Sequence, residues 1–361
     1  MTDTVRWGIL GAGSMAMRFA RDLSHTRKGQ FVAVASRNPT RAQQLVSAAG
    51  IAHHGARAIE NYAALVSDPN VDAIYIATPT AMHREHALLA IAAGKPVLCE
   101  KPLAGGLADA RAVADAAQSA GVFCMEALWS RFLPAFRELE RRIETLGPLR
   151  HIEATLGFAR VERAGDPVTD QRLGGGALND LGVYPLALAT ALIGKMELMS
   201  CDVRRSADLG ETVRDAALLL KSESGVAINI STSHTTVLSN RLVIAGDNGR
   251  ITIDAPFIEA LGFRHLPVMP VDHRAGDGSG RATIALKMSA LWPILRKLSK
   301  PMRHPDGRHV SYDYRGTGLQ FQAEEVQRCL SLGLHESPLL PLAASIHVQD
   351  LITKVKQFDT A

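Results

Sequence analysis

The chain has 361 residues, of which 47% are hydrophobic and 21% charged, and its formal net charge is +4. This composition is typical of a globular protein, and the length suggests two domains of roughly 150 residues. The small positive surplus does not indicate a nucleic-acid partner, so we expect none. The cysteines have no zinc-like spacing, and no cluster of His, Asp and Glu predicts a metal ion.

Targeting and membrane signals are weak in this sequence. Residues 1–10 lack the basic segment and long apolar core of a secretory signal. The longest near-apolar run, residues 183–194, is shorter than the roughly 18 residues that a membrane-spanning helix needs. We therefore expect a reduced, cytoplasmic protein with no membrane partner.

The first 125 residues alternate between short apolar segments and segments with helical spacing. Strands are predicted at residues 5–10, 31–35, 71–77, 96–99 and 122–125, and helices at residues 14–23, 83–93 and 107–120. Apolar strands that alternate with helices are typical of a parallel sheet buried on both faces. We therefore predict an α/β domain over residues 1–125.

The pattern changes after residue 127. Helices are predicted at residues 131–146, 176–192, 318–332 and 342–357, and strands at residues 149–158, 196–204, 215–221, 225–234, 241–245 and 250–254. Successive strands joined by tight turns, such as Asp247-Asn248-Gly249, favour an antiparallel sheet. We predict a second, α+β domain over residues 126–361, packed closely against the first because no Gly- or Pro-rich linker separates them.

Residues 264–308 are the hardest part of the chain to interpret. The stretch 287–303 combines basic and apolar side chains, which suits either a surface loop with one helix or a contact with a membrane or partner. Pro293 interrupts the helical pattern, so we favour the surface loop.

A glycine-rich turn, GAGSMA at residues 11–16, follows the first predicted strand. Gly11 permits the tight turn, and Gly13 lets a pyrophosphate approach the backbone. The N–H groups of Ser14 and Met15, at the start of the next helix, favour a phosphate. A strand before the turn and a helix after it predict a dinucleotide site rather than an ordinary turn.

The second predicted strand ends where an NAD-binding protein usually has an acidic residue for the ribose 2′-hydroxyl. Here the sequence has Ser36 and Arg37 instead, and Arg41 follows. Ser36 can donate to a 2′-phosphate, and the arginines can pair with it. The segment favours NADP(H) as cofactor, the alternative being two solvated arginines at the start of a helix.

Glu100-Lys101-Pro102 directly follows another buried strand. Ligands of parallel sheets bind at the carboxyl ends of the strands, so Lys101 is predicted to point into that crevice. An ion pair at the end of the strand would give the same pattern.

These motifs, with four further stretches, resemble the Gfo/Idh/MocA family of oxidoreductases. The stretches that carry the resemblance are residues 78–83 (TPTAMH), 94–102 (GKPVLCEKP), 125–135 (MEALWSRFLPA), 173–185 (LGGGALNDLGVYP) and 318–326 (GLQFQAEEV). The last three resemble the branch of dimeric dihydrodiol dehydrogenases, which includes NADP-dependent D-xylose dehydrogenases.

The resemblance implies a Rossmann domain, followed by a domain with an open and largely antiparallel sheet. In the family that sheet often forms the dimer interface, so we expect a homodimer or homotetramer. It also implies that Thr78, Pro79, His83 and Glu100 lie at the cofactor, and that Lys101 reaches both cofactor and substrate.

The family often has Asp-x-x-x-His on the helix after the glycines, and this chain has Asp180 and Tyr184 there. The branch it resembles uses that Tyr as the acid/base. Residues four apart share one face of a helix. We predict that the Lys101 ammonium lies close to the phenol and lowers its pKa, while Asp180 keeps Lys101 protonated and oriented. A core position for the Tyr184 ring is the alternative.

Four other residues are candidates for substrate contacts. Trp129, Arg131 and Phe132 follow the last strand of the first domain, although Trp129 and Phe132 suit the core nearly as well. Arg172 precedes the glycines of residues 174–176.

We expect an NADP-dependent oxidoreductase that acts on the CH–OH group of a sugar, a polyol or a trans-dihydrodiol. Two other functions stay open. The chain could be a catalytically silent NADP-binding sensor, or a lyase or glycosidase that recycles its cofactor in each turnover.

Overall fold

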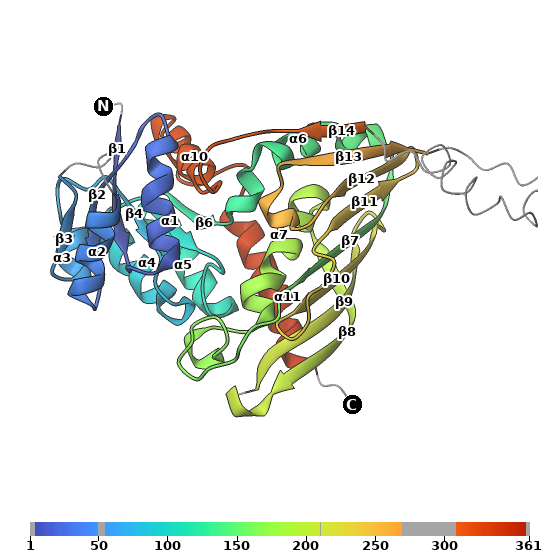
Figure 1. Ribbon diagram of the computed structural model, residues 1–361, viewed down its shortest axis with the longest axis horizontal. Coiled ribbons are helices and arrows are strands. Elements are labelled where there is room, and N and C mark those ends of the chain that lie inside the picture. The colour runs from blue at the N-terminus through green and yellow to red at the C-terminus, as the bar shows by residue number, and fades with distance from the viewer. Residues whose placement is uncertain (1–3, 50–54, 210, 269–307, 359–361) are drawn as a thin grey trace, which may run out of the picture.

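The structure is a computed structural model that describes residues 4–49, 55–209, 211–268 and 308–358. The basic stretch 287–303 lies outside these residues. Two sheets form the two ends of the molecule, and helices α7 (Val183–Ile193) and α11 (Leu342–Gln357) lie between them (Figure 1). Within the described ranges, no helix is long and apolar enough to cross a membrane.

The first sheet has six parallel strands in the order β3-β2-β1-β4-β5-β6. Its strands are β1 (Val5–Leu10), β2 (Gly29–Ala35), β3 (Arg57–Ile59), β4 (Ala73–Ile76), β5 (Val97–Glu100) and β6 (Cys124–Ala127). The helices are α1 (Ser14–Asp22), α2 (Pro39–Ala49), α3 (Tyr62–Val66), α4 (His83–Ala92) and α5 (Leu107–Ala120). The strand order reverses between β1 and β4, and dinucleotides bind at such a point.

The predicted parallel α/β domain is therefore confirmed, including all five predicted strands. The sequence analysis missed β3, α2 and α3. Strand β3 has three residues and is mostly exposed, so it lacks an apolar signal.

The second sheet has eight strands in the order β14-β13-β12-β11-β7-β10-β9-β8. The strands are β7 (Leu149–Gly157), β8 (Met196–Ser206), β9 (Thr212–Ser222), β10 (Ala227–Ser233), β11 (Leu242–Gly246), β12 (Gly249–Ile253), β13 (Gly262–Pro267) and β14 (Arg308–Ser311). Neighbours are antiparallel, except that β10 pairs with β7 in parallel. The predicted antiparallel sheet is confirmed, and the parallel pair at its centre was not foreseen.

The helix predicted at residues 131–146 is wrong as a single element. A 3-10 turn covers Trp129–Phe132, α6 covers Pro134–Arg142, and a second 3-10 turn covers Ile143–Leu146. Pro134 has no N–H to continue a helix, and it disfavours helical backbone at Leu133, whose ψ is 140°.

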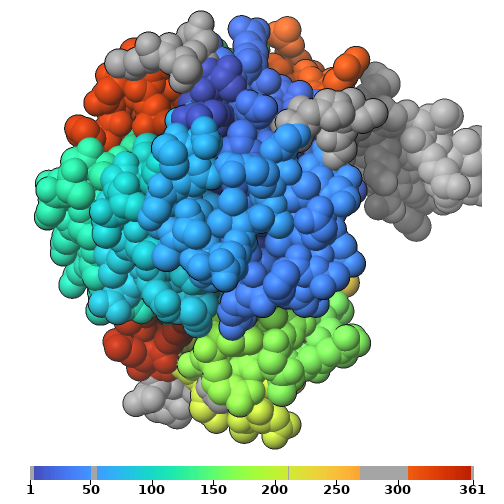
Figure 2. Space-filling model, turned by 90° about the vertical axis from the view of Figure 1, so that its left-hand side faces the viewer, coloured from blue at the N-terminus to red at the C-terminus, as the bar shows by residue number. Residues whose placement is uncertain are grey.

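The end of the chain returns to the first sheet. The buried Asp22 carboxylate at the end of α1 accepts hydrogen bonds from the N–H groups of Thr317 and Leu319, just before α10 (Gln320–Ser331). Gln349 of α11 donates to the carbonyl of Ala104. Figure 2 shows the red C-terminal helices against the blue and cyan first domain. The boundary near residue 125 stays a prediction, whereas the predicted close packing is confirmed by one hydrophobic core that includes both sheets.

Candidate active site

The glycine-rich turn after β1 leaves room for other groups to approach its backbone closely. Gly11 has φ +100°, and a Cβ there would lie 2.6 Å from the carbonyl oxygen of Ala77. A side chain at this position is excluded by the backbone of Ala77, which directly follows the neighbouring strand β4. At Gly13, a Cβ would meet nothing within 4 Å, so the space in front of α1 is open. The helix has no acidic residue in its first turn and no side-chain cap, which leaves its N–H groups for an anion.

A cavity of about 380 Å³ begins at this turn and runs between the two halves of the chain. The residues that line it are Gly11, Ala12, Gly13, Ser14, Met15, Ser36, Arg37, Asn38, Arg41, Tyr62, Ala77, Thr78, Pro79, Thr80, His83, Glu100, Lys101, Pro102, Pro167, Val168, Gly174, Gly175, Asn179 and Asp180. All predicted cofactor residues are among them. The cavity therefore joins the arginines that follow β2 to Lys101 and Asp180.

Two cations stand at one end of the cavity. Arg37 and Arg41 are exposed, and within the described residues neither makes an ion pair. Ser36 Oγ accepts a hydrogen bond from the N–H of Asn38 at 3.2 Å. A phosphorylated adenosine fits this end, because it offers a dianion to two unpaired guanidinium groups. With the open helix terminus at Gly13, the cavity fits a dinucleotide phosphate.

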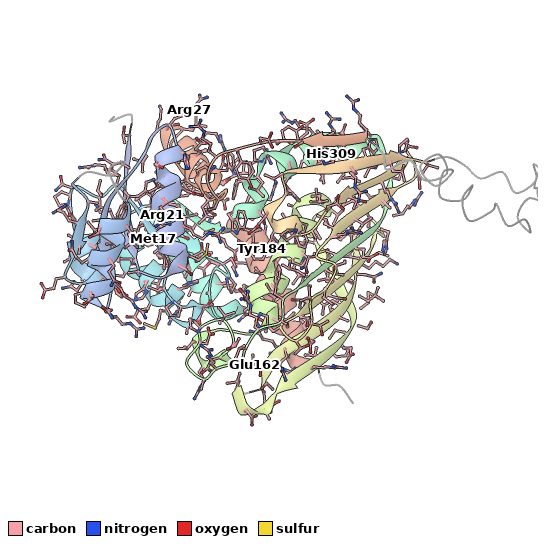
Figure 3. The ribbon with its side chains drawn as sticks, viewed as in Figure 1. Met17, Arg21, Arg27, Glu162, Tyr184 and His309 are labelled. Carbon is pink, nitrogen blue, oxygen red and sulfur yellow. The ribbon has the colours of Figure 1, made fainter. Side chains whose placement is uncertain are left out.

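Lys101 stands at the other end and reaches across to the second half of the chain. Its Nζ lies 2.7 Å from the carbonyl oxygen and 2.9 Å from Oδ1 of Asp180. The same Nζ lies 4.9 Å from the centre of the Tyr184 ring. Figure 3 shows Tyr184 in the middle of the molecule, between the two sheets. The predicted meeting of Lys101 with Asp180 and Tyr184 is therefore present.

A π-helical turn, Leu178–Gly182, places Asp180 just before α7. The predicted continuous helix over residues 176–192 is thus interrupted at this point. Oδ2 of Asp180 accepts a hydrogen bond from His234 Nε2 at 3.1 Å and forms an ion pair with Arg160 Nη2 at 3.1 Å. Burial alone would raise the pKa of Asp180, but Lys101, His234 and Arg160 outweigh burial and hold that pKa well below its usual range. The carboxylate therefore stays ionised at neutral pH.

The charge of Asp180 in turn raises the pKa of Lys101. Burial acts to lower the pKa of Lys101, but the attraction of Asp180 and Tyr184 is stronger, so that pKa lies above its usual value. The ammonium form is thus maintained across the neutral range.

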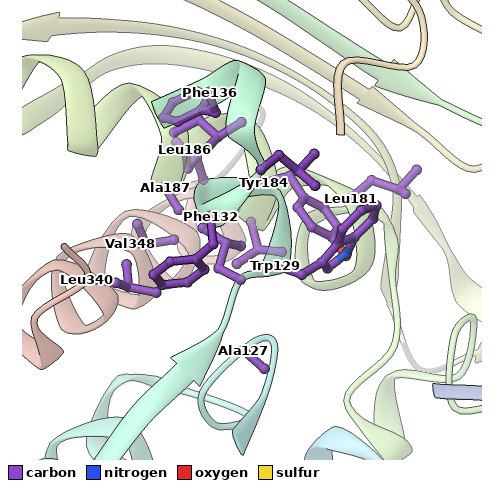
Figure 4. Close-up of a cluster of buried hydrophobic side chains, with 14 of the residues drawn as sticks. Ala127, Trp129, Phe132, Phe136, Leu181, Tyr184, Leu186, Ala187, Leu340 and Val348 are labelled. Carbon is purple, nitrogen blue, oxygen red and sulfur yellow. The ribbon is translucent and has the colours of Figure 1, made fainter. Parts of the chain in front are cut away.

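Tyr184 belongs to the buried cluster of Figure 4. Trp129 Nε1 donates a hydrogen bond to Tyr184 Oη at 3.0 Å. Lys101 acts to lower the pKa of the phenol, as predicted, but burial is the larger effect and the pKa is raised. The prediction of a lowered pKa is therefore wrong for this state of the protein, and Tyr184 is a neutral phenol at pH 7.

His83 and Glu100 both line the cavity. His83 contacts backbone carbonyls, and Glu100 contacts a neighbouring side chain. The two ring nitrogens of His83 lie 2.8 Å from the carbonyl oxygen of Pro102 and 2.9 Å from that of Thr78. Burial lowers the pKa of His83 to about 4, so the ring is neutral and its single N–H can donate to one of these two carbonyls. Burial also raises the pKa of Glu100, which accepts a hydrogen bond from Tyr75 Oη.

Tyr184 is not among the residues that line the cavity, and neither are the four other predicted substrate residues. Arg131 is buried and forms an ion pair with Glu140. Phe132 packs in the core. Arg172 points its guanidinium at Asp170, with Nε at 2.9 Å from Oδ1. Trp129 is connected to the site by its hydrogen bond to Tyr184, and the substrate roles of all four residues stay predictions.

Sequence reasoning missed Arg160 and His234. Each follows the end of a strand, β7 and β10 respectively, and the parallel pairing of Gly157 with Ser233 brings the two ends together. Parallel strands end at the same edge of a sheet, so this pairing would have been the signal. It joins strands that are far apart in the sequence, and no local pattern predicts it.

Comparison with known proteins shows the family to which the chain belongs. Residues 5–128 match the model of an oxidoreductase family with an NAD-binding Rossmann fold, and residues 136–252 match the GFO/IDH/MocA C-terminal domain. The trans-1,2-dihydrobenzene-1,2-diol dehydrogenase of Sus scrofa is 32% identical, over 98% of this chain and 96% of that protein. The Homo sapiens enzyme of the same name is 29% identical over the same shares.

Two solved structures share the fold. A 3-ketoreductase from Actinomadura kijaniata, in complex with NADP and TDP-benzene, has a TM-score of 0.77 at 22% identity, covering 98% of this chain and 97% of that one. The aldose-aldose oxidoreductase from Caulobacter crescentus has the same TM-score, identity and coverage. The two domain matches and the full-length similarity establish that this chain belongs to the Gfo/Idh/MocA family of oxidoreductases, with an NAD(P)-binding Rossmann domain.

Proposed function

We propose that the protein is an NADP-dependent oxidoreductase that interconverts a CH–OH group and a carbonyl, with Tyr184 as acid/base and Lys101 as its partner. The observation that carries the proposal is the position of Lys101 Nζ, which is bonded to Asp180 and lies over the Tyr184 ring at the end of the dinucleotide cavity. The substrate class is a sugar, a polyol or a trans-dihydrodiol, supported by the names of the similar proteins.

The Tyr184 hydroxyl is ready to give a proton. Its oxygen accepts from Trp129, and within the described residues no acceptor is recorded for its own hydrogen. The raised pKa keeps that hydrogen in place at neutral pH. During reduction of a carbonyl, Tyr184 Oη would donate the proton to the new alkoxide oxygen. In the opposite direction the phenolate would take it back from the hydroxyl.

Lys101 would stabilise the negative charge that develops on the substrate oxygen. Its ammonium already faces the phenol, and Asp180 fixes its direction, so little reorganisation is needed during the reaction. The residues of the cavity from Gly11 to Arg41 would hold the cofactor, with Arg37 and Arg41 at a 2′-phosphate. The nicotinamide supplies or accepts the hydride when bound.

The test is a screen of sugars, polyols and trans-dihydrodiols, and of the matching carbonyl compounds, by absorbance of the reduced cofactor. We expect turnover with at least one compound, and a loss of about a hundredfold or more in kcat for Tyr184→Phe. The phenylalanine keeps the ring under Lys101, and so cofactor binding should be unchanged.

The same screen separates the two other functions. Tight NADPH binding without turnover of any compound would contradict the proposal and favour a sensor. Product formation without net change in NADP(H) would favour a lyase or glycosidase.

We further propose that the chain forms a homodimer or homotetramer through the outer face of the second sheet. Alternate residues of β9, such as Leu218 and Leu220, are buried toward α7 and α11, so Leu219 faces outward. Its side chain is 43% exposed, which a second copy would cover.

A further inference from the structure

Asp180 has hydrogen-bond or ion-pair partners on both carboxylate oxygens, and two of these partners lie outside every motif of the sequence. Lys101 Nζ lies 2.9 Å from Oδ1. Oδ2 has His234 Nε2 and Arg160 Nη2, each at 3.1 Å. The carboxylate is therefore fixed in rotation, because each oxygen has its own partner.

The protonation of His234 follows from this contact. A carboxylate can only accept hydrogen bonds, so the ring must carry a hydrogen on Nε2. The backbone holds the ring in this position, since the His234 N–H donates to the carbonyl of Arg214 and the His234 carbonyl accepts from the N–H of Arg160. These bonds place both side chains at one edge of the sheet, facing Asp180.

We propose that His234 and Arg160 are positioning residues for catalysis. They hold Oδ2 of Asp180, so that Oδ1 and the Asp180 carbonyl keep the Lys101 ammonium over the Tyr184 ring. This assignment rests on the proposed function of Lys101 and Tyr184. Without donors at Oδ2 the carboxylate would turn, and the ammonium would lose one of its two fixed partners.

The two residues contribute unequally. The side chain of His234 is 2% exposed, whereas that of Arg160 is 37% exposed. Solvent screens an exposed ion pair, but a buried hydrogen bond to a charged group keeps its strength. His234 is therefore the more important of the two.

The kinetic test compares His234→Leu with His234→Gln, because Gln retains an N–H donor and Leu does not. We expect kcat to fall about tenfold to a hundredfold in His234→Leu, with most of it restored in His234→Gln. The KM of the substrate and the Kd of NADPH should change little. Arg160→Met should lower kcat less than His234→Leu does. Wild-type kcat in His234→Leu, or equal losses in the Leu and Gln variants, would overturn the assignment.

A second measurement needs no turnover. In the ¹⁵N spectrum of the histidine side chains, assigned with His234→Gln, we expect a proton on Nε2 of His234 and a change of that signal in Asp180→Asn. An Nε2 without a proton would refute the assignment, even if Leu at position 234 prevents folding. Absence of turnover in the wild type, with Nε2 protonated, would instead refute the proposed function alone.

Discussion

Tyr184 illustrates how two opposing effects decide the charge of one residue. Lys101 favours the phenolate, but burial in the core between the sheets disfavours any charge on the ring, and burial is the larger effect. In the function we propose, the neutral phenol would act as an acid, which suits carbonyl reduction near neutral pH. As a base it depends on the small fraction of phenolate.

The first prediction concerns the pH dependence of the two directions. Below the raised pKa of Tyr184, each pH unit changes the phenolate fraction about tenfold. We expect kcat/KM for oxidation to rise by nearly that factor per unit from pH 7 to 9, while reduction stays flat. Steady-state rates with a substrate from the screen will measure both. Tyr312→Phe, a change beyond β14 and away from the cavity, should keep both profiles, and a plateau of oxidation at pH 7 would contradict the assignment.

The second prediction concerns Arg37. Arg37→Ala removes a cation at the end of the cavity where we propose that the adenosine binds, and this cation has no ion pair within the described residues, so NADP⁺ affinity should fall about tenfold to a hundredfold. NAD⁺ has no 2′-phosphate, and its affinity should change less than about threefold. Titration calorimetry will give both constants. The matched control is Arg111→Ala on the exposed face of α5, and equal losses for the two cofactors would rule out the phosphate contact.

At the scale of elements, the short loop that contains Gly174 belongs to the second half of the chain and lines the cavity opposite the first half. Gly174 has φ +86°, and a Cβ there would lie 2.6 Å from Cβ of Thr80. Asn179 Nδ2 donates to the Gly174 carbonyl at 2.8 Å, which ties this loop to the turn that carries Asp180. The glycine thus sets how closely the two halves approach.

The third prediction separates backbone strain from this close approach. Gly165 has φ +80° and open space around a Cβ, so Gly165→Ala tests strain alone, at about 1–2 kcal/mol. Gly174→Ala adds the collision with Thr80. We expect Gly174→Ala to lower the free energy of unfolding by about 1 kcal/mol more than Gly165→Ala does, and to weaken NADPH binding severalfold. Denaturant titration and cofactor titration of both variants will show this, and equal effects would mean that the contact with Thr80 is unimportant.

The whole molecule is organised around the space between its two sheets. Helices α7 and α11 fill most of that space with one continuous hydrophobic core, and the cavity occupies the edge where the two halves meet. The opposite face of the second sheet, which carries Leu219, takes no part in this core.

The fourth prediction tests assembly through that face. A charge at Leu219 would have to be buried in the interface, so Leu219→Lys should lower the oligomeric state by one step. Light scattering coupled to size exclusion will measure the mass. Leu332→Lys, at a residue that is 61% exposed after α10, is the control and should not change it. An unchanged mass in Leu219→Lys would argue against this interface.

The sequence by itself determined the parallel α/β sheet of residues 5–127 and predicted cofactor residues from Gly11 to Lys101 that line the cavity. The strands, the glycines and Lys101 follow from local patterns, namely apolar strands, glycines at fixed spacing and charged residues at strand ends, whereas Asp180 and Tyr184 were predicted from the resemblance to a family. The tertiary structure alone decided the charge of the phenol, because burial depends on how both sheets enclose the ring. It also decided the partners of Asp180, since Arg160 and His234 reach it only through the pairing of β7 with β10. The tertiary structure also placed Phe132 and Arg131 away from the cavity, because the local sequence pattern does not predict how the two halves pack.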